Sequence, residues 1–294
     1  MNYQVLLFYK YVSIDDPEAV RESQRALCEE LGLKGRIIIA HNGINATVEG
    51  TADKTGLYIE KMKQDPRFAD IVYKKSAGTG GAMPRLRVRV RKDLVSDHTE
   101  EWGVDPHEVT GKYLTSEELH EWINSGKKFY IMDMRNDYEH KGGHFKDSIL
   151  PDIENFRDLP KVLPKLKKYD DRPIVTVCTG GIRCERASGL LLKNGFKDVY
   201  QLKDGIVTYM EKYPNEDFMG KLYVFDNRIL MGFDTESPKH EVVGRCVGCD
   251  SKSENYINCI NDNCHRHLIA CEKCLQATGG LCPQGCRDMR SIVG

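Results

Sequence analysis

Apolar residues repeat with strand and helix periods across the first third of the chain. The segments with strand patterns cover residues 3–12, 35–40, 43–50 and 85–95. The segments with helical patterns cover residues 16–33 and 51–66, and Asp16 is the expected N-cap of the first. The pair Asn42-Gly43 predicts a hairpin between the second and third strands. The order strand, helix, strand, strand, helix, strand predicts a ferredoxin-like domain over residues 1–95.

A second alternating pattern follows a polar, turn-rich stretch that we interpret as a linker over residues 96–111. Thr115 and Glu118 form a capping box at the start of its first helix. The further elements predicted are strands over 127–133, 173–178 and 197–202, and helices over 159–169 and 183–195. Because the strand over 173–178 is almost continuously apolar, we expect a parallel sheet that is covered on both faces. The pattern predicts a doubly wound α/β domain over residues 112–214.

The composition is that of an ordinary globular protein. The 294 residues are 40% hydrophobic and 30% charged, which suits two or three domains. The formal net charge is -1, so a nucleic-acid-binding surface has to be local. No apolar run approaches the roughly 20 residues that span a bilayer, and the start lacks signal-peptide features. We therefore expect a cytoplasmic protein without a membrane partner.

The last part of the chain, residues 215–294, has little periodic signal but holds most of the cysteines. Eight of the eleven form close pairs: Cys246 and Cys249, Cys259 and Cys264, Cys271 and Cys274, Cys282 and Cys286. In a reducing compartment such pairs predict metal ligands rather than disulfides. Eight thiolates suit two four-cysteine zinc sites, and iron–sulfur ligation stays open. His265 and His267 are interpreted as surface residues or as neighbours of the ligands, and metal binding is expected to fold this cysteine-rich domain.

The stretch after the strand over 173–178 has the features of a reactive cysteine loop. Cys178 stands at the carboxyl end of the strand, where open α/β sheets place their active sites. The residues expected to form an anion cradle around it are Thr179, Gly180, Gly181 and Ile182. A helix start and Arg183 add positive charge, so we expect an ionised and reachable thiolate. The alternative, an inert core cysteine, requires neither the two glycines nor the arginine.

Two residues just after the loop have more than one interpretation. In one interpretation, Cys184 is a second thiol that resolves a persulfide on Cys178 or forms a disulfide with it. In the other, Cys184 is a core cysteine that faces the sheet. Glu185 either positions a base or caps the helix, and we favour the cap.

The segment from Cys178 to Arg183 resembles the active loop of rhodanese-type sulfurtransferases, which also have four residues between cysteine and arginine. Supporting motif residues are Asp133, Arg135, Glu139, Gly143, His144, Leu202, Gly205 and Ile206. The related phosphatase loop is one residue longer, which disfavours a phosphatase. The family usually has Gly-Gly where Asp204 and Gly205 stand, and we interpret this departure as a detail of the turn.

The string from Cys178 to Glu185, residues 218–228 and the cysteine-rich tail together resemble one narrower family, the bacterial rhodanese-domain tRNA uridine hydroxylases. The resemblance implies an acylphosphatase-like N-terminal domain and oxygen-dependent 5-hydroxylation of the wobble uridine of tRNA. It also implies that Cys178 is a persulfide-type or otherwise essential cysteine, and that Arg183 is its anion partner.

A row of arginines alternates with apolar residues in the strand over 85–95. The row consists of Arg85, Arg87, Arg89 and Arg91. Such a row either tracks an RNA backbone or forms a solvated sheet face, and nearby lysines make the two interpretations equally good.

Three functions are compatible with these observations. In the first, the N-terminal domain and tail hold the anticodon arm, and Cys178 adds to C6 of a splayed-out uridine, which makes C5 nucleophilic. In the second, the chain is a sulfurtransferase that uses thiosulfate or a persulfide. In the third, it is a zinc-stabilised RNA-binding protein without catalysis, which would not require an intact Cys178 and Arg183. The sequence defines neither the electron source nor the oligomeric state.

Overall fold

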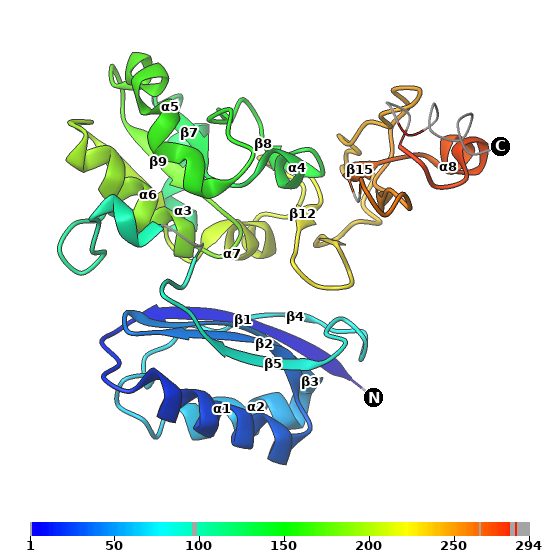
Figure 1. The fold of residues 1–294 in the computed structure, drawn as a ribbon. Coiled ribbons are helices and arrows are strands. Elements are labelled where there is room, and N and C mark those ends of the chain that lie inside the picture. Colours follow the sequence, from blue (N-terminus) through cyan, green and yellow to red (C-terminus); the bar gives the residue numbers. More distant parts are fainter. Residues whose placement is uncertain (1, 96–98, 265, 283–285, 287–294) are drawn as a thin grey trace.

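The computed structural model describes residues 2–95, 99–264, 266–282 and 286. Three parts follow one another along the chain (Figure 1). An N-terminal sheet carries two helices on one face, and its other face looks toward the central α/β part. The cysteine-rich tail lies beside the central part, at the end of a long irregular segment.

The N-terminal part is a five-stranded sheet in the order β4-β1-β3-β2-β5. Its strands are β1 (Tyr3–Tyr11), β2 (Lys34–Ala40), β3 (Gly43–Thr51), β4 (Lys74–Ala77) and β5 (Leu86–Val90). Its helices are α1 (Pro17–Leu31) and α2 (Ala52–Met62). The Asp16 side chain accepts a hydrogen bond from the amide of Ala19, so the predicted N-cap is confirmed.

The predicted fold class is confirmed, but one strand was assigned wrongly. The ferredoxin-like sheet is closed by β4, which pairs antiparallel with β1, and not by the segment over 85–95. That segment forms β5, an additional edge strand parallel to β2. Because β4 has only four residues and reads Lys-Lys-Ser-Ala, it has no apolar alternation that would predict a strand.

The central part contains a four-stranded parallel sheet in the order β6-β10-β9-β7. The strands are β6 (Lys112–Leu114), β7 (Tyr130–Asp133), β9 (Ile174–Val177) and β10 (Val199–Leu202). The helices are α3 (Ser116–Asn124), α4 (Asp137–His140), α5 (Leu159–Leu166), α6 (Ile182–Lys193) and α7 (Gly205–Lys212). All four residues of β9 are buried, as its apolar sequence predicts, and the capping box of Thr115 and Glu118 is present.

Residues 99–111, part of the stretch expected to be a linker, pack onto the central part. This stretch contains the short 3-10 helix η1 (Thr99–Trp102). Two further 3-10 helices, η2 (Phe156–Asp158) and η3 (Lys167–Tyr169), lie later in the central part. The guanidinium of Arg186 in α6 donates to the carbonyls of Thr99 and Val104 and pairs with Asp93 at 2.5 Å. The ring of Trp102 packs on Phe156. Residues 96–98 of the expected linker lie outside the described residues.

The tail has little regular structure, as its lack of periodicity predicts. Its elements are β11 (Phe218–Gly220), β12 (Leu222–Tyr223), β13 (Leu230–Met231), β14 (Tyr256–Asn258), β15 (His267–Ile269) and α8 (Glu272–Thr278). One further strand, β8 (Gly143–Phe145), belongs to the central part. β11 pairs with β8 and so joins the tail to the central part. Residues 283–285 and 287–294 of this predicted domain, and His265, are outside the described residues.

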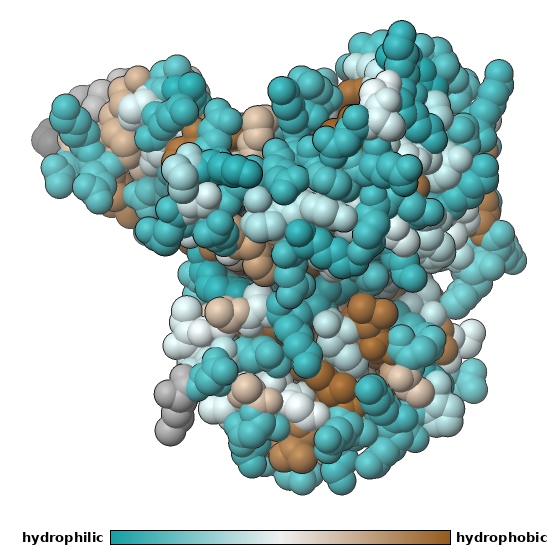
Figure 2. All heavy atoms as spheres, turned by 180° about the vertical axis from the view of Figure 1, so that it is seen from behind, coloured by the Kyte–Doolittle hydropathy of each residue, from teal (hydrophilic) through white to brown (hydrophobic). Residues whose placement is uncertain are grey.

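The face of the molecule shown in Figure 2 carries only small apolar patches. Hydrophilic side chains cover most of the face seen in Figure 2, with the apolar residues in separate groups. Within the described residues, no helix has the length and apolar character needed to cross a membrane. Among the exposed large apolar residues are Phe225 and Val247, and each of these borders a cavity.

Candidate active site and metal centres

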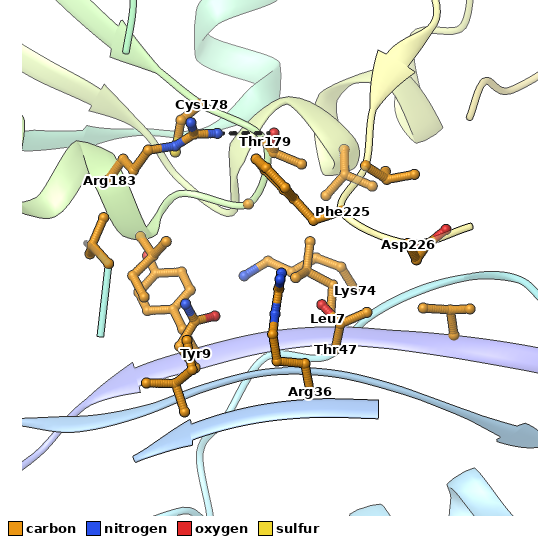
Figure 3. Close-up of a pocket in the computed structure, with 18 of the residues that line it drawn as sticks. Leu7, Tyr9, Arg36, Thr47, Lys74, Cys178, Thr179, Arg183, Phe225 and Asp226 are labelled. Carbon is orange, nitrogen blue, oxygen red and sulfur yellow. Dashed lines mark hydrogen bonds between the residues drawn. The ribbon is translucent and has the colours of Figure 1, made fainter. Parts of the chain in front are cut away.

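A cavity of about 310 Å³ lies between the N-terminal sheet and the cysteine loop (Figure 3). The sheet contributes residues of β1 to β4, among them Tyr9, Arg36 and Lys74. The central part contributes the loop around Cys178, and the tail contributes Phe225 with its neighbours. All three parts of the chain therefore build one site.

One amide of the expected anion cradle, that of Gly181, contacts the sulfur of Cys178. Cys178 follows β9, and its Sγ accepts a hydrogen bond of 3.2 Å from the amide of Gly181. Gly181 has a φ of 100°, a left-handed conformation that favours glycine. A Cβ at Gly181 would also lie 2.9 Å from the hydroxyl oxygen of Tyr9. The glycine therefore serves both the loop conformation and the close approach of the N-terminal sheet.

The surroundings of Cys178 favour its thiolate. Burial raises the pKa of the thiol, but a hydrogen bond from Cys184, the charge of Arg183 and the amides of Cys184 and Arg183 together lower this pKa below its ordinary value. Burial and the neighbouring Cys178 raise the pKa of Cys184 well above its ordinary value. Cys184 is fully buried in the core, and its raised pKa favours the neutral thiol there.

Cys178 is more enclosed than expected. Its side chain has 0% exposed surface, although we had expected a reachable sulfur. The N-terminal sheet provides the cover, since Gly180 lies against Leu7 and Gly181 lies against Tyr9. Cys178 nevertheless borders the cavity, so the loop that holds it forms part of the cavity wall.

Arg183 has a different direct partner from the one predicted. Its guanidinium makes a two-pronged ion pair with Glu139, with N···O distances of 2.6 and 2.8 Å. It also donates to the hydroxyl of Thr179 at 3.3 Å, as the dashed line in Figure 3 marks. Arg183 therefore acts on Cys178 through its charge, while Glu139 fixes its orientation.

Replacing Glu139 with glutamine is expected to lower the free energy of unfolding of the central part by about 3–5 kcal/mol. Glu139 is fully buried, so the substitution leaves the Arg183 cation enclosed without a carboxylate. Both tryptophans of the chain, Trp102 and Trp122, lie in or against this part, so urea titration followed by their fluorescence reports on it.

The matched control for Glu139→Gln is Asp158→Asn, which breaks an ion pair with Lys161 whose lysine is exposed. Such surface pairs contribute only about 0–1 kcal/mol, so this variant is expected to unfold like the wild type. Equal destabilisation by the two substitutions would show that Glu139 has no special role in holding Arg183.

Lys74 reaches the cavity from the N-terminal sheet. Its side chain is almost fully buried, and its Nζ lies 3.2 Å from the carboxylate of Asp204 and 4.8 Å from the ring centre of Tyr9. Burial lowers the pKa of Lys74, although Asp204 and Cys178 oppose this effect. Asp204 adopts a left-handed turn conformation with a φ of 64°, and its carboxylate also joins two parts of the chain at the site.

Glu185 does not cap the helix, which corrects the interpretation that we favoured. Its buried carboxylate accepts hydrogen bonds of 3.0 Å from the hydroxyls of Tyr9 and Tyr113. Thr110 and Gln201 donate to the same carboxylate. Glu185 therefore links the N-terminal sheet to the central part directly behind the cysteine loop.

The predicted arginine row runs along the exposed side of β5, with Arg87 and Arg89 in the strand and the other two arginines just outside its ends. Arg85, Arg87, Arg89 and Arg91 are all exposed, and Val88 packs into the core on the other face. Arg87 pairs in register with Arg36 of β2, so the two side chains share one face of the sheet. Because Arg36 borders the cavity, the row continues a basic face that leads away from the site. No local pattern in the sequence singled out Arg36.

The eight tail cysteines form two sets of four. One set is Cys246, Cys249, Cys271 and Cys274, and the other is Cys259, Cys264, Cys282 and Cys286. The sulfurs of each set lie within 4.8 Å of one another. The Sγ atoms of Cys249 and Cys271 lie 3.6 Å apart, and those of Cys264 and Cys282 lie 3.8 Å apart. Four sulfurs bound to one zinc at about 2.3 Å lie about 3.8 Å apart, so both sets fit this ion.

The two sets interleave along the chain. Along the chain, the pair that begins with Cys246 joins the pair that begins with Cys271. The pair that begins with Cys259 joins the pair that begins with Cys282. Neither set includes His267, whose ring nitrogens contact the hydroxyl of Tyr223 and the side-chain oxygen of Asn258. Each set therefore combines cysteines from two separate segments of the tail.

Three protein families match successive parts of the chain. The UPF0176 acylphosphatase-like domain matches residues 3–94, the rhodanese-like domain matches residues 115–212, and the rhodanase C-terminal family matches residues 219–287. Among solved structures, a rhodanese-like domain from Anabaena sp. is 20% identical and aligns with a TM-score of 0.32, covering 38% of this chain and 80% of that chain.

Curated relatives match almost the whole chain and are named tRNA uridine(34) hydroxylase. The relative from Bacillus licheniformis is 44% identical, over 92% of this chain and 84% of its own. The relative from Cytophaga hutchinsonii is 41% identical, over 97% and 90%, and that from Enterococcus faecalis is 45% identical, over 93% and 86%. Identity at this level over all three parts, together with the cysteine loop and both cysteine sets, shows that the chain belongs to the tRNA uridine(34) hydroxylase family.

Proposed function

We propose that this chain hydroxylates C5 of uridine 34 of tRNA, with molecular oxygen as co-substrate, in the cytoplasm. The single observation that supports this most is the composite cavity, in which an activated cysteine meets cations and apolar walls from all three parts of the chain. A sulfurtransferase needs only the cysteine loop. A macromolecular substrate explains why the N-terminal sheet and the tail also border the site.

The cavity has the chemistry to hold a uridine that has left the base stack. Leu7 and Phe225 offer apolar surface, and Phe225 is 42% exposed, with the Arg36 guanidinium 5.8 Å from its ring centre. RNA-modifying enzymes take the target base out of its stack and hold it between aromatic or apolar side chains. In our proposal the base enters beside Phe225, and Arg36 binds the adjacent phosphate.

In the proposed reaction the Cys178 thiolate adds to C6 of the uracil ring and leaves a nucleophilic C5. Lys74, whose ammonium points into the cavity in Figure 3, offsets the negative charge that develops on the ring. Oxygen transfer forms the C5–O bond, and loss of the C5 proton and of the sulfur restores the double bond. One oxygen atom ends in water, so an external two-electron donor and two protons complete the reaction.

The proposed RNA contacts extend from the cavity along β5. The arginine row carries four exposed cations, and each phosphate that they neutralise releases a counterion. Together with the tail, this face is proposed to hold the anticodon arm while uridine 34 occupies the cavity.

We propose zinc as the metal of both four-cysteine sets. None of the eight cysteines is among the residues that line the cavity, which supports a structural role for the ions. When bound, zinc supplies the free energy that folds a segment with few apolar contacts of its own.

The proposed function is tested by mass spectrometry of tRNA nucleosides from a strain that lacks uridine 34 hydroxylation. Expression of this chain is expected to restore 5-hydroxyuridine-type modification. An unmodified tRNA, combined with strong transfer of sulfur from thiosulfate to cyanide by the purified protein, would replace the proposal with the sulfurtransferase alternative.

A further inference from the structure

A second cavity, of about 220 Å³, lies between α4 and the cysteine-rich tail. Its aromatic lining residues are Tyr138, Tyr256 and His267. Its rim carries three exposed cations, Lys141, Arg245 and Arg266. The cavity thus combines ring surface with positive charge, outside the site that holds Cys178.

A run of aromatic rings joins this second cavity to the first. It starts at Phe225, which borders the first cavity, and passes to Tyr223 with a centroid distance of 5.3 Å. Tyr223 lies 5.5 Å from Tyr256, and Tyr256 stacks on His267 at 4.9 Å. The two cavities therefore border one continuous aromatic cluster within the tail.

The charge around the second cavity favours an anionic ligand. None of its lining residues is an aspartate or a glutamate, and its one cysteine, Cys282, belongs to the second four-cysteine set. Lys141 pairs with Asp137, but within the described parts of the chain Arg245 and Arg266 have no carboxylate at ion-pairing distance. His267 has both ring nitrogens engaged, and burial lowers its pKa, so it contributes a neutral ring rather than a charge.

We propose that the second cavity binds an unpaired nucleobase of the same tRNA loop, close to uridine 34. This inference rests on the proposed function and deepens it. Single-stranded RNA is bound by aromatic side chains that stack on bases and by cations that hold the backbone. The aromatic rings take the base, Arg245 and Arg266 take its flanking phosphates, and the aromatic run sets its separation from the base above Cys178.

This second contact gives the protein a means of selecting its substrate. A uridine alone fits the first cavity in any single strand. Occupation of both cavities requires a second unpaired base at a fixed distance along the strand, which a tight loop provides and a duplex does not. The second cavity thereby reads the shape of the loop while the first holds the reacting base.

The first test uses the wild-type protein and a set of anticodon stem-loop RNAs, each lacking one base at an unpaired position other than 34. Removal of the base that occupies the second cavity is expected to raise the Kd by about tenfold, the usual effect of losing one base–aromatic stack. Equal Kd values for all the abasic RNAs, within twofold of the complete loop, would overturn the proposal.

The second test uses the substitutions Arg245→Glu and Arg266→Glu, with Lys239→Glu as the matched exposed control in the tail. The two arginine variants are expected to raise the Kd for the complete loop about tenfold, and the control less than threefold. Removal of the base that occupies the second cavity should raise the Kd less in either arginine variant than in the wild type, because the missing base and the missing arginine belong to one contact. If an arginine variant with wild-type metal content shows the same rise in Kd on removal of that base as the wild type does, the assignment of the base to the second cavity is contradicted.

The two proposals fail separately. Binding of stem-loops is measured without oxygen or turnover, so loss of hydroxylation alone leaves the test of the second cavity intact. If the protein hydroxylates uridine 34 but its Kd does not change on removal of any other loop base, the proposed function stands and this inference is wrong.

Discussion

Replacing Cys178 with serine is expected to lower the rate of uridine 34 hydroxylation by about a thousandfold or more, as loss of a covalent nucleophile does in other enzymes. The charge and amides that surround the sulfur lower the pKa of a thiol, but a serine hydroxyl stays neutral under the same influences. The measurement is the amount of hydroxylated nucleoside formed per unit time from purified tRNA.

The matched control is Cys28→Ala. Cys28 lies in the core of the N-terminal part, where burial raises the pKa of its thiol to about 12. A cysteine held as a neutral thiol far from the cavity is not expected to take part in the reaction, so this variant should retain most of the activity. Cys178→Ser with more than a tenth of wild-type activity would exclude a covalent role for Cys178.

Removal of metal ligands is expected to have the largest effect on stability. In small zinc-binding peptides, the binding of a structural zinc ion contributes roughly 10–16 kcal/mol of apparent free energy to folding. Cys246→Ser and Cys271→Ser fall in one set, so their combination should remove a single ion and leave one per chain. Cys246→Ser combined with Cys259→Ser affects both sets and should remove both ions.

Metal analysis of the purified variants counts the ions, and tryptophan fluorescence shows whether the central part stays folded, since Trp102 and Trp122 both report on it. Equal metal loss from the two double variants would contradict the interleaved pairing. Strong visible absorption with bound iron in the wild type would show iron–sulfur clusters and contradict zinc.

Local sequence signals predicted the elements whose structure depends on neighbouring residues. The Asp16 cap, the capping box at Thr115 and the buried strand β9 were all found in this way. β4 was missed because its stability comes from pairing with β1, about 70 residues earlier, and its own residues are polar. The strand over 85–95 was predicted correctly as a strand but placed at the wrong edge, since periodicity does not define which neighbour a strand chooses.

The candidate site was predictable only where it is contiguous in sequence. The loop from Cys178 to Arg183 forms one turn, so its glycines and helix start pointed to an activated thiol. Lys74 and Tyr9 meet this loop across long sequence separations, and no local pattern relates them to it. Glu185 shows the same limit, because its role follows from hydroxyl donors on distant segments and not from its place in the first turn of α6.

Hydrogen exchange at C5 of uridine 34 tests most directly whether Cys178 forms a bond to C6. The experiment incubates wild-type protein and Cys178→Ser with tRNA in deuterated buffer without oxygen. Addition of the thiolate to C6 leaves a C5 carbanion that takes a deuteron, and reversal then releases the exchanged base. We predict deuterium at C5 with the wild type and none with Cys178→Ser. Equal deuterium with both proteins, or none with a wild type that hydroxylates the same tRNA in air, would contradict the account.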